Sequence, residues 1–353
     1  MAFATRGPQA QAVIGALILL FLIWLFAPFN PSAYNQSPPA SPGVVKPGKD
    51  TSDLPPVLSN SSSSEEDGQG SLIDKDEFRP LILYAYAESD AARENIKFFI
   101  HQGLHGAADF VFILNGIEDA DYLEIPQKPN VRVVKRDNTC FDLGAYGEVL
   151  RQDGLWAKYK RFIMLNASIR GPFLPYWSKG CWSDLYLAKL TGKVKLVGMT
   201  ANCWPRFHVQ SMIWATDAVG IDLLLNPPPG SRVEDEFGGA DAPVGLAGCY
   251  GDWNAAVHAE VGSTEAVREP GYEVDLMMMA FHKSGNYIDE CANSEGNGDL
   301  LWQGKYFGTN VHPYETIFIK ANRDIDPTLI EHLTEWHETA GTSSWDVCRG
   351  ASL

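Results

Sequence analysis

Five short apolar runs, separated by segments with helical spacing, constrain the fold of this chain more than any other feature of its sequence. Each run is too short for a buried helix and is almost continuously apolar, as expected of strands that are covered on both faces. The alternation predicts an α/β domain with a Rossmann-like, mostly parallel sheet and helices on both faces. The expected strands are 81–86, 109–114, 131–135, 159–165 and 194–198, and the expected helices are 90–103, 142–154 and 178–190.

Ligands of such a sheet bind beyond the carboxyl ends of its strands. The loops in these positions are polar: one carries Glu88 and Asp90, the next runs over 136–144, and the third over 166–172. There is no GxGxxG after the first strand and no GxxxxGK[ST] or GxSxG motif anywhere, which weakens NAD-binding, P-loop and α/β-hydrolase interpretations. The acidic and amide groups of these loops favour an enzyme that uses sugar nucleotides.

The N-terminal part contains an uncharged apolar run over residues 12–29. At 1.5 Å per residue a helix of this length spans roughly 27 Å, close to the hydrocarbon thickness of a bilayer. Arg6 precedes the run and the next cation is Lys46, so the positive-inside rule places residues 1–11 in the cytosol. We expect an uncleaved signal anchor in the lipid bilayer. A cleaved signal peptide, with a weak site at 30–33, and a buried core helix are the alternatives.

Residues 30–77 are rich in Pro and Ser and have little apolar surface to bury, so we expect a disordered stem. The remainder, residues 78–353, is then a luminal globular domain. This layout is typical of Golgi-resident enzymes, and the predicted location is the Golgi or ER membrane as a single-pass type II protein. Sequons at Asn35, Asn60 and Asn166 fit luminal exposure.

The net charge and the cysteine content bear on nucleic-acid binding, disulfide pairing and zinc binding. The 28 basic and 44 acidic side chains give a formal net charge of −16, which argues against binding to nucleic acid but not against a small phosphate ligand. We expect the six cysteines to pair at least in part in an oxidising lumen, although fifteen full connectivities are open. None is spaced as CxxC, so no zinc site is expected.

Several patches from Arg79 onward resemble one known family. They are RDNTCFDLGAYGEVL (136–150), YKRFIMLNASIRGPFLPYW (159–177), HVQSMIWATDAVGIDLL (208–224), EVGSTEAVREPGYEVDLMM (260–278) and YFGTNVHPYETIFIKANR (306–323). In this order they resemble the rhamnan-synthesis F family of glycosyltransferases. The resemblance implies a GT-A-type fold and transfer of a hexose or deoxyhexose from a nucleotide-sugar donor to a glycan acceptor. It does not specify the donor, the acceptor or the stereochemical course.

The resemblance also implies where the nucleotide binds. Tyr84, with Tyr86, is expected to stack on a base, with ordinary strand packing as the alternative. Asp137 is expected to accept hydrogen bonds from the base or ribose. Asn138, Asp142 and Gly144 are expected near the phosphates, because glycine permits close approach and a helix start offers free N–H groups. The alternative for Asp142 is a helix cap.

Asn166 and Ser168 occupy the place where many GT-A enzymes carry Asp-x-Asp for Mn²⁺ or Mg²⁺. Neither is a carboxylate, so we expect no tight metal site and no cofactor beyond the donor itself. We expect both to bind sugar hydroxyls or the diphosphate, with Arg170 supplying positive charge. Glycosylation of Asn166 is the alternative.

For catalysis we expect Glu260 to act as the base, in preference to Asp235 or Glu273. The alternative for Glu260 is a solvated helix end, since it closes the expected helix 253–260. Asp142 is also a candidate catalytic group.

The C-terminal candidates are cationic. His312 is expected near the diphosphate, and Lys320 or Arg323 is expected to neutralise the leaving group, against core packing or surface ion pairing. Asp252 and Trp253 are expected to flank the acceptor.

Two other functions remain open. One is a non-catalytic luminal carbohydrate-binding protein on a degenerate transferase fold. The other is a luminal hydrolase that uses the pair Asp235 and Asp241 or the pair Glu260 and Glu273.

Overall fold

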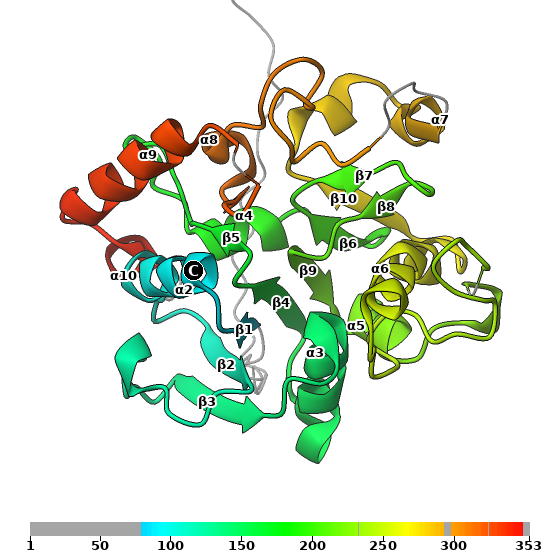
Figure 1. Cartoon of the computed structure of the whole chain (residues 1–353), viewed down its shortest axis with the longest axis horizontal. Helices are drawn as coiled ribbons and strands as arrows, with labels where there is room; N and C mark the ends of the chain where they lie inside the picture. The colour runs from blue at the N-terminus through cyan, green and yellow to red at the C-terminus, as the bar shows by residue number, and fades with distance from the viewer. Residues whose placement is uncertain (1–78, 232, 293–297, 324, 349–353) are drawn as a thin grey trace, which may run out of the picture. The chain divides into compact units, whose positions relative to one another are not determined.

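The computed structural model describes residues 79–353 except 232, 293–297, 324 and 349–353. Its centre is a seven-stranded sheet in the order β10-β6-β9-β4-β1-β2-β3 (Figure 1). The strands are β1 (Leu81–Ala87), β2 (Asp109–Asn115), β3 (Val131–Arg136), β4 (Arg161–Asn166), β6 (Val194–Gly198), β9 (Ile213–Asp217) and β10 (Glu273–Leu276).

The sheet is mostly parallel, as the sequence predicts. Strand β1 pairs in parallel with β2 and β4, β2 with β3, and β6 with β10. Strand β9 lies between β4 and β6 and is antiparallel to both. All five expected strands are confirmed, whereas β9 and β10 were not predicted.

Helices cover both faces of the sheet (Figure 1). Helices α2 (Asp90–Gln102), α4 (Trp182–Leu187) and α9 (Pro327–Thr339) lie on one face, and α3 (Phe141–Arg151), α5 (Ala218–Leu225) and α6 (Trp253–Arg268) lie on the other. Helix α4 is shorter than the predicted 178–190. Three further short helices are α7 (Tyr287–Ala292), α8 (Pro313–Thr316) and α10 (Ser344–Val347). Segments of 3₁₀ helix are η2 (Asp121–Leu123), η3 (Gln152–Lys158, with a kink at Asp153 and Gly154), η4 (Pro229–Ser231) and η5 (Met279–Lys283).

Two small antiparallel ribbons shape the site. Strand β5 (Ile169–Arg170) pairs with β11 (Ile319–Lys320), which brings the late segment 319–323 beside the end of β4. Strand β7 (Ala201–Asn202) pairs with β8 (His208–Val209) next to α6.

All six cysteines form disulfides, in agreement with the expected pairing. The bonds are Cys140–Cys249, Cys181–Cys348 and Cys203–Cys291, and they close loops of 109, 167 and 88 residues. Each links segments far apart in the sequence, so they constrain the arrangement of the helices around the sheet.

No helix among the described residues has the length and apolar character needed to cross a bilayer. The expected cytosolic tail (1–11), membrane span (12–29) and stem (30–77), together with Asn35 and Asn60, lie outside the described residues.

Candidate functional site

A small cavity of about 160 Å³ lies at the carboxyl ends of β1 and β4. This is the edge of a parallel sheet where ligands are expected to bind. The side chains and backbone that line it come from the β1–α2 connection, the start of α3, the β4–β5 turn and the segment after β11. The lining residues are Ala85, Ala87, Ser89, Ala91, Ala92, Asp142, Asn166, Ala167, Ser168 and Asn322.

Asp142 does not cap α3, contrary to the alternative drawn from the sequence. The helix begins one residue earlier, at Phe141, and its N-cap Cys140 makes no side-chain capping bond. The carboxylate of Asp142 instead accepts a hydrogen bond of 2.7 Å from the side-chain amide of Asn166. The structure therefore joins two of the predicted site residues across two different loops.

The carbonyl oxygen of Asn166 is also occupied. It accepts hydrogen bonds from the backbone N–H of Ser168 at 3.0 Å and from the Ser168 hydroxyl at 2.6 Å. Asn166 is buried, with 8% of its surface exposed. Its amide is consequently fixed in orientation, and it holds Asp142 and Ser168 in a single polar group.

This group does not fit a divalent metal ion. A hard cation selects several charged oxygens, but Asp142 is the only carboxylate in the Asp142–Asn166–Ser168 group. The Asn166 oxygen already accepts two hydrogen bonds, and its nitrogen is directed at Asp142. The residues present match hydrogen bonding to hydroxyl groups better than metal ligation.

The ionisation of Asp142 is unusual. Burial raises the pKa of its carboxyl from 3.8 to about 6, although the hydrogen bond from Asn166 and the positive charge of Lys320 act in the opposite direction. The negative charge of Glu260 adds to the increase. Asp142, Lys320 and Glu260 are thus close enough for their charges to interact.

Glu260 lies in the middle of α6, which continues to Arg268, so it is not the solvated helix end considered from the sequence. One carboxylate oxygen accepts hydrogen bonds from the Ser211 backbone N–H at 2.5 Å and from the Ser211 hydroxyl at 2.7 Å. The other oxygen lies 4.0 Å from Nε2 of His208. Ser211 and His208 were not predicted, because no local pattern marks a loop that packs on a helix fifty residues later.

Two cations approach from the C-terminal segment. Burial lowers the pKa of Lys320, as does the charge of Arg323, whereas Glu260, Asp299 and Asp142 raise it. Arg323 forms an ion pair of 3.2 Å with Asp299 and stacks 4.2 Å above the Trp302 ring. Lys320 therefore lies within electrostatic range of three carboxylates, those of Glu260, Asp299 and Asp142.

Tyr84 and Tyr86 do not offer a ring face to a base in this structure. Tyr84 is 1% exposed and packs against Phe99 and Phe112, with ring centroids 4.8 and 5.6 Å away. Tyr86 is buried, and its hydroxyl donates to Glu88 at 2.6 Å. Both match the strand-packing alternative.

Gly144 and Arg170 contribute to packing and ion pairing within the domain rather than to a ligand site. A Cβ at position 144 would lie 2.9 Å from the carbonyl oxygen of Gly248, so glycine there permits close packing of α3 on another loop. The guanidinium of Arg170 donates to Asn95 at 2.8 Å and to Glu94 at 2.6 Å. Its charge is paired on α2 and is not directed at Asp142.

The other predicted residues lie at the surface. His312 is exposed, and its Nδ1 accepts the backbone N–H of Tyr314, which makes it the N-cap of α8. Asp137 and Asn138 are exposed in the β3–α3 loop. Asn138 packs near Gly116, at the end of β2.

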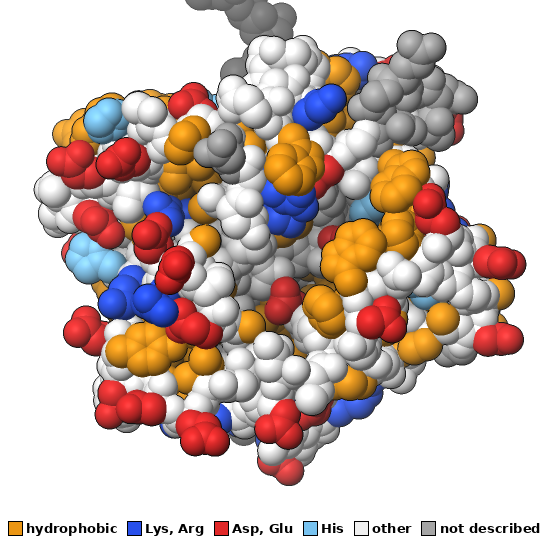
Figure 2. Space-filling model, viewed as in Figure 1, with side chains coloured by type: hydrophobic (Ala, Val, Ile, Leu, Met, Phe, Trp, Pro, Cys, Tyr) orange, Lys and Arg blue, Asp and Glu red, His pale blue; other side chains and the backbone are white. Residues whose placement is uncertain are grey.

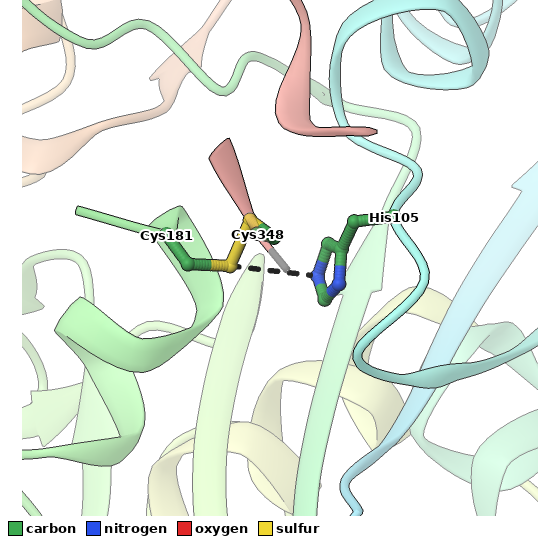
Figure 3. Close-up of side chains that lie close together, drawn as sticks. All are labelled: His105, Cys181 and Cys348. Atoms are coloured by element: carbon green, nitrogen blue, oxygen red, sulfur yellow. Dashed lines mark hydrogen bonds between the residues drawn. A yellow bond between two sulfur atoms is a disulfide. The ribbon is translucent and has the colours of Figure 1, made fainter. Parts of the chain in front are cut away.

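A buried histidine lies beside one disulfide (Figure 3). Among the described residues, His105, Cys181 and Cys348 form a group with the spacing of metal ligands. The two sulfurs are bonded to each other, and Nε2 of His105 is 3.9 Å from Cys181 Sγ. Burial lowers the pKa of His105 to about 3. The group is therefore a neutral histidine packed on a disulfide.

The surface above the sheet is hollowed (Figure 2). Acidic side chains lie at the bottom of the hollow, and hydrophobic side chains border it. The polar group of Asp142, Asn166, Ser168, Glu260 and Lys320 provides hydrogen-bond acceptors, donors and one cation at this edge of the sheet. From here on it is called the polar centre.

No protein-family model and no curated protein matches the chain. Among solved structures, a mannosyltransferase from Pyrobaculum calidifontis in complex with GDP-Man and Mn²⁺ is similar with 13% identity and a TM-score of 0.37, over 56% of this chain and 54% of that one. A cytidylyltransferase from Leptospira borgpetersenii is similar with 13% identity and a TM-score of 0.25, over 42% of this chain and 63% of that one. The chain thus spans less than two thirds of either protein, and similarities this weak carry no argument about its activity.

Proposed function

We propose that this chain is a GT-A-type glycosyltransferase related to the rhamnan-synthesis F family. It moves a hexose or deoxyhexose from a nucleotide-sugar donor to a glycan acceptor. The observation that carries the proposal is the polar centre, where the Glu260 carboxylate and the partly buried Lys320 are close enough for their charges to interact, beside the carboxyl ends of β1 and β4.

In this proposal Glu260 is the general base. The two hydrogen bonds from Ser211 hold one of its oxygens in place, which leaves the second oxygen to accept the proton of the acceptor hydroxyl. The acceptor oxygen then forms a bond to the anomeric carbon as the bond from that carbon to the diphosphate oxygen breaks. The electron pair of the broken bond stays on the nucleoside diphosphate.

Lys320 stabilises the charge that develops on the leaving diphosphate. Its partial burial makes an added phosphate charge more favourable than it would be in water, because the local dielectric constant is low. Asn166 and Ser168 orient the transferred sugar by hydrogen bonds from the small cavity. Asp142, which is close to half protonated near pH 6, is suited both to donate to and to accept from a sugar hydroxyl.

We also propose that the enzyme is anchored in the Golgi or ER membrane with its catalytic domain in the lumen. Three disulfides support an oxidising compartment. The apolar run 12–29 supplies the anchor.

A non-catalytic carbohydrate-binding protein is the second candidate function. It is favoured by one observation, namely that Asn166 and Ser168 stand where carboxylates are usual. The hydrolase alternative is weaker, because Glu273 lies at the amino end of β10 and pairs with Lys193 at 3.7 Å, away from the carboxyl edge.

Substitution of Glu260 tests the function. Glu260→Gln keeps an acceptor oxygen for Ser211 and removes the base, so we expect transfer from an active nucleotide-sugar to fall by about 100-fold or more with donor binding retained. Glu265→Gln, on the same helix, is the matched control and should retain activity. Wild-type transfer by Glu260→Gln would remove the proposed base. Failure of the wild-type chain to use any UDP-, GDP- or dTDP-sugar with a glycan acceptor would favour the binding protein.

A further inference from the structure

Three aromatic side chains from separate segments meet at the surface next to the polar centre. The Phe237 ring packs edge-to-face with Trp204 at 5.2 Å and with Trp253 at 5.5 Å. Trp204 is 44% exposed and Trp253 is 60% exposed. An exposed group of large rings costs solubility, so such a patch marks a binding surface more often than isolated apolar residues do.

Two elements, helix α6 and the segment from Trp204 to Ser211, connect this aromatic group to Glu260. Trp253 is the first residue of α6 and Glu260 follows seven residues later, which places both on the same side of the helix and ~10.5 Å apart along its axis. Trp204 lies just before β8, in the segment that continues to Ser211, the hydrogen-bond partner of Glu260. The rings and the base therefore belong to one face of the molecule.

Hydrogen bonds hold the loop that carries Phe237: Oδ1 of Asp235 accepts the backbone N–H groups of Phe237 at 2.9 Å and of Gly238 at 3.0 Å. Asp235, two residues before Phe237, lies 2.9 Å from Nδ1 of His258 and 3.8 Å from the guanidinium of Arg206. Asp252 accepts the backbone N–H of Ala255 and so fixes the start of α6 at Trp253. The rings are consequently presented by a stable support, which lowers the entropic cost of binding.

We propose that Trp204, Phe237 and Trp253 form a platform for the acceptor glycan, on which a pyranose ring one residue removed from the reacting sugar stacks. This rests on the proposed function. The apolar C–H face of a pyranose matches an exposed indole, and its hydroxyl groups remain free to bind polar side chains such as the exposed Glu236 and Asn254, the sequence neighbours of Phe237 and Trp253. The separation of Trp253 from Glu260 corresponds to two linked pyranose rings, so the platform selects acceptors of at least a disaccharide.

The binding test uses the full-length chain and an array of mono-, di- and trisaccharides without donor, followed by titration calorimetry with the best disaccharide and its monosaccharide. We expect the wild type to prefer the disaccharide and Trp253→Ala or Trp204→Ala to weaken its binding about tenfold or more. Trp253→Tyr should retain most of the affinity. Trp177→Ala, which removes another exposed indole, is the matched control and should bind normally.

The outcomes separate the platform from the proposed function. Equal affinity of the wild type and both alanine variants, or no binding of any oligosaccharide by the wild type, overturns the platform. Nucleotide-sugar binding, measured on the same variants by thermal shift, should be unchanged because the platform does not contact the donor. Loss of disaccharide preference in Trp253→Ala with normal donor binding supports the platform, and this result stands even if no transfer is found.

Discussion

The role of Asp142 depends on residues that are remote in sequence. Its position after a turn residue predicts a cap, but the carboxylate is bonded to Asn166, 24 residues away, and interacts with Lys320. Phe141, with φ of 51°, begins the helix one residue early and so moves Asp142 out of the capping position. Such contacts leave no local signal. The sequence therefore predicts Asp142, Asn166, Ser168 and Glu260 as candidate site residues, but it does not predict the contacts between them.

The raised pKa of Asp142 predicts a specific pH dependence of stability. As the pH rises from about 4 to about 6, the unfolded chain releases this proton while the folded chain retains it. The wild type therefore loses stability over this range. Above about pH 6 both states are ionised, and the loss of stability stays constant. Asp142→Asn does not titrate and can keep the hydrogen bond from Asn166. Thermal melts should show that the melting temperature of Asp142→Asn, relative to that of the wild type, is higher at pH 7.5 than at pH 4.5. A difference in melting temperature that is equal at both pH values would contradict the assignment.

Asn166 is predicted to carry no glycan in the folded protein, although it lies in a sequon. Its side-chain nitrogen is buried and donates to Asp142, so this nitrogen is not accessible for covalent attachment of a glycan. Peptide mass spectrometry of protein secreted or retained in a eukaryotic host should find Asn166 unmodified. A glycan at high occupancy on Asn166 would show that the polar centre is arranged differently.

At the level of elements, the five predicted strands are confirmed because each has a short apolar run in its own sequence. Strands β1, β2, β4 and β6 are buried, whereas the edge strand β3 is mostly exposed, contrary to the expectation that every strand is covered on both faces. The sequence assigns its segment, Ile213–Asp217, to no element, so strand β9 was not predicted. This segment forms a strand because it pairs with β4 on one side and with β6 on the other. The late strand β11 has only two residues, and its pairing with β5 places Lys320 beside the site. Short pairings of this kind are set by tertiary structure alone.

Helix α3 provides a prediction at the same scale. A Cβ at Gly147 would lie 2.1 Å from the carbonyl oxygen of Leu246. Alanine ordinarily stabilises a helix interior by about 1 kcal/mol relative to glycine, but here the clash should dominate and lower the free energy of unfolding by about 1–3 kcal/mol. Urea denaturation of Gly147→Ala measures this. Gly192→Ala, where a Cβ meets nothing within 4 Å, should be neutral, and a stabilised Gly147→Ala would refute the close approach.

For the whole molecule, the α/β class and its mostly parallel sheet follow from the alternation of strands and helices, while the disulfide pairing does not. Six cysteines without regular spacing give no basis for choosing among connectivities, and bonds such as Cys181–Cys348 depend on the final fold.

The proposed topology can be tested on the intact protein. With residues 12–29 as an uncleaved anchor and the domain in the lumen, protease added to sealed microsomes should leave stem and domain intact. An endoglycosidase should then lower the mass of the protected fragment by removing glycans from the stem sequons at Asn35 and Asn60. Digestion of the domain, or a mature N-terminus near residue 33, would contradict the anchor.

A thermal-shift panel determines whether the polar centre binds a nucleotide-sugar. The full-length chain in detergent would be heated with UDP-, GDP- and dTDP-sugars in turn, beside Lys320→Met. A ligand at a hundred times its dissociation constant adds about 2.7 kcal/mol of stability. We predict that one nucleotide class stabilises the wild type and that Lys320→Met loses at least tenfold in apparent affinity while folding normally. If no nucleotide-sugar stabilises the wild type, or if Lys320→Met responds equally, the polar centre is not a donor site.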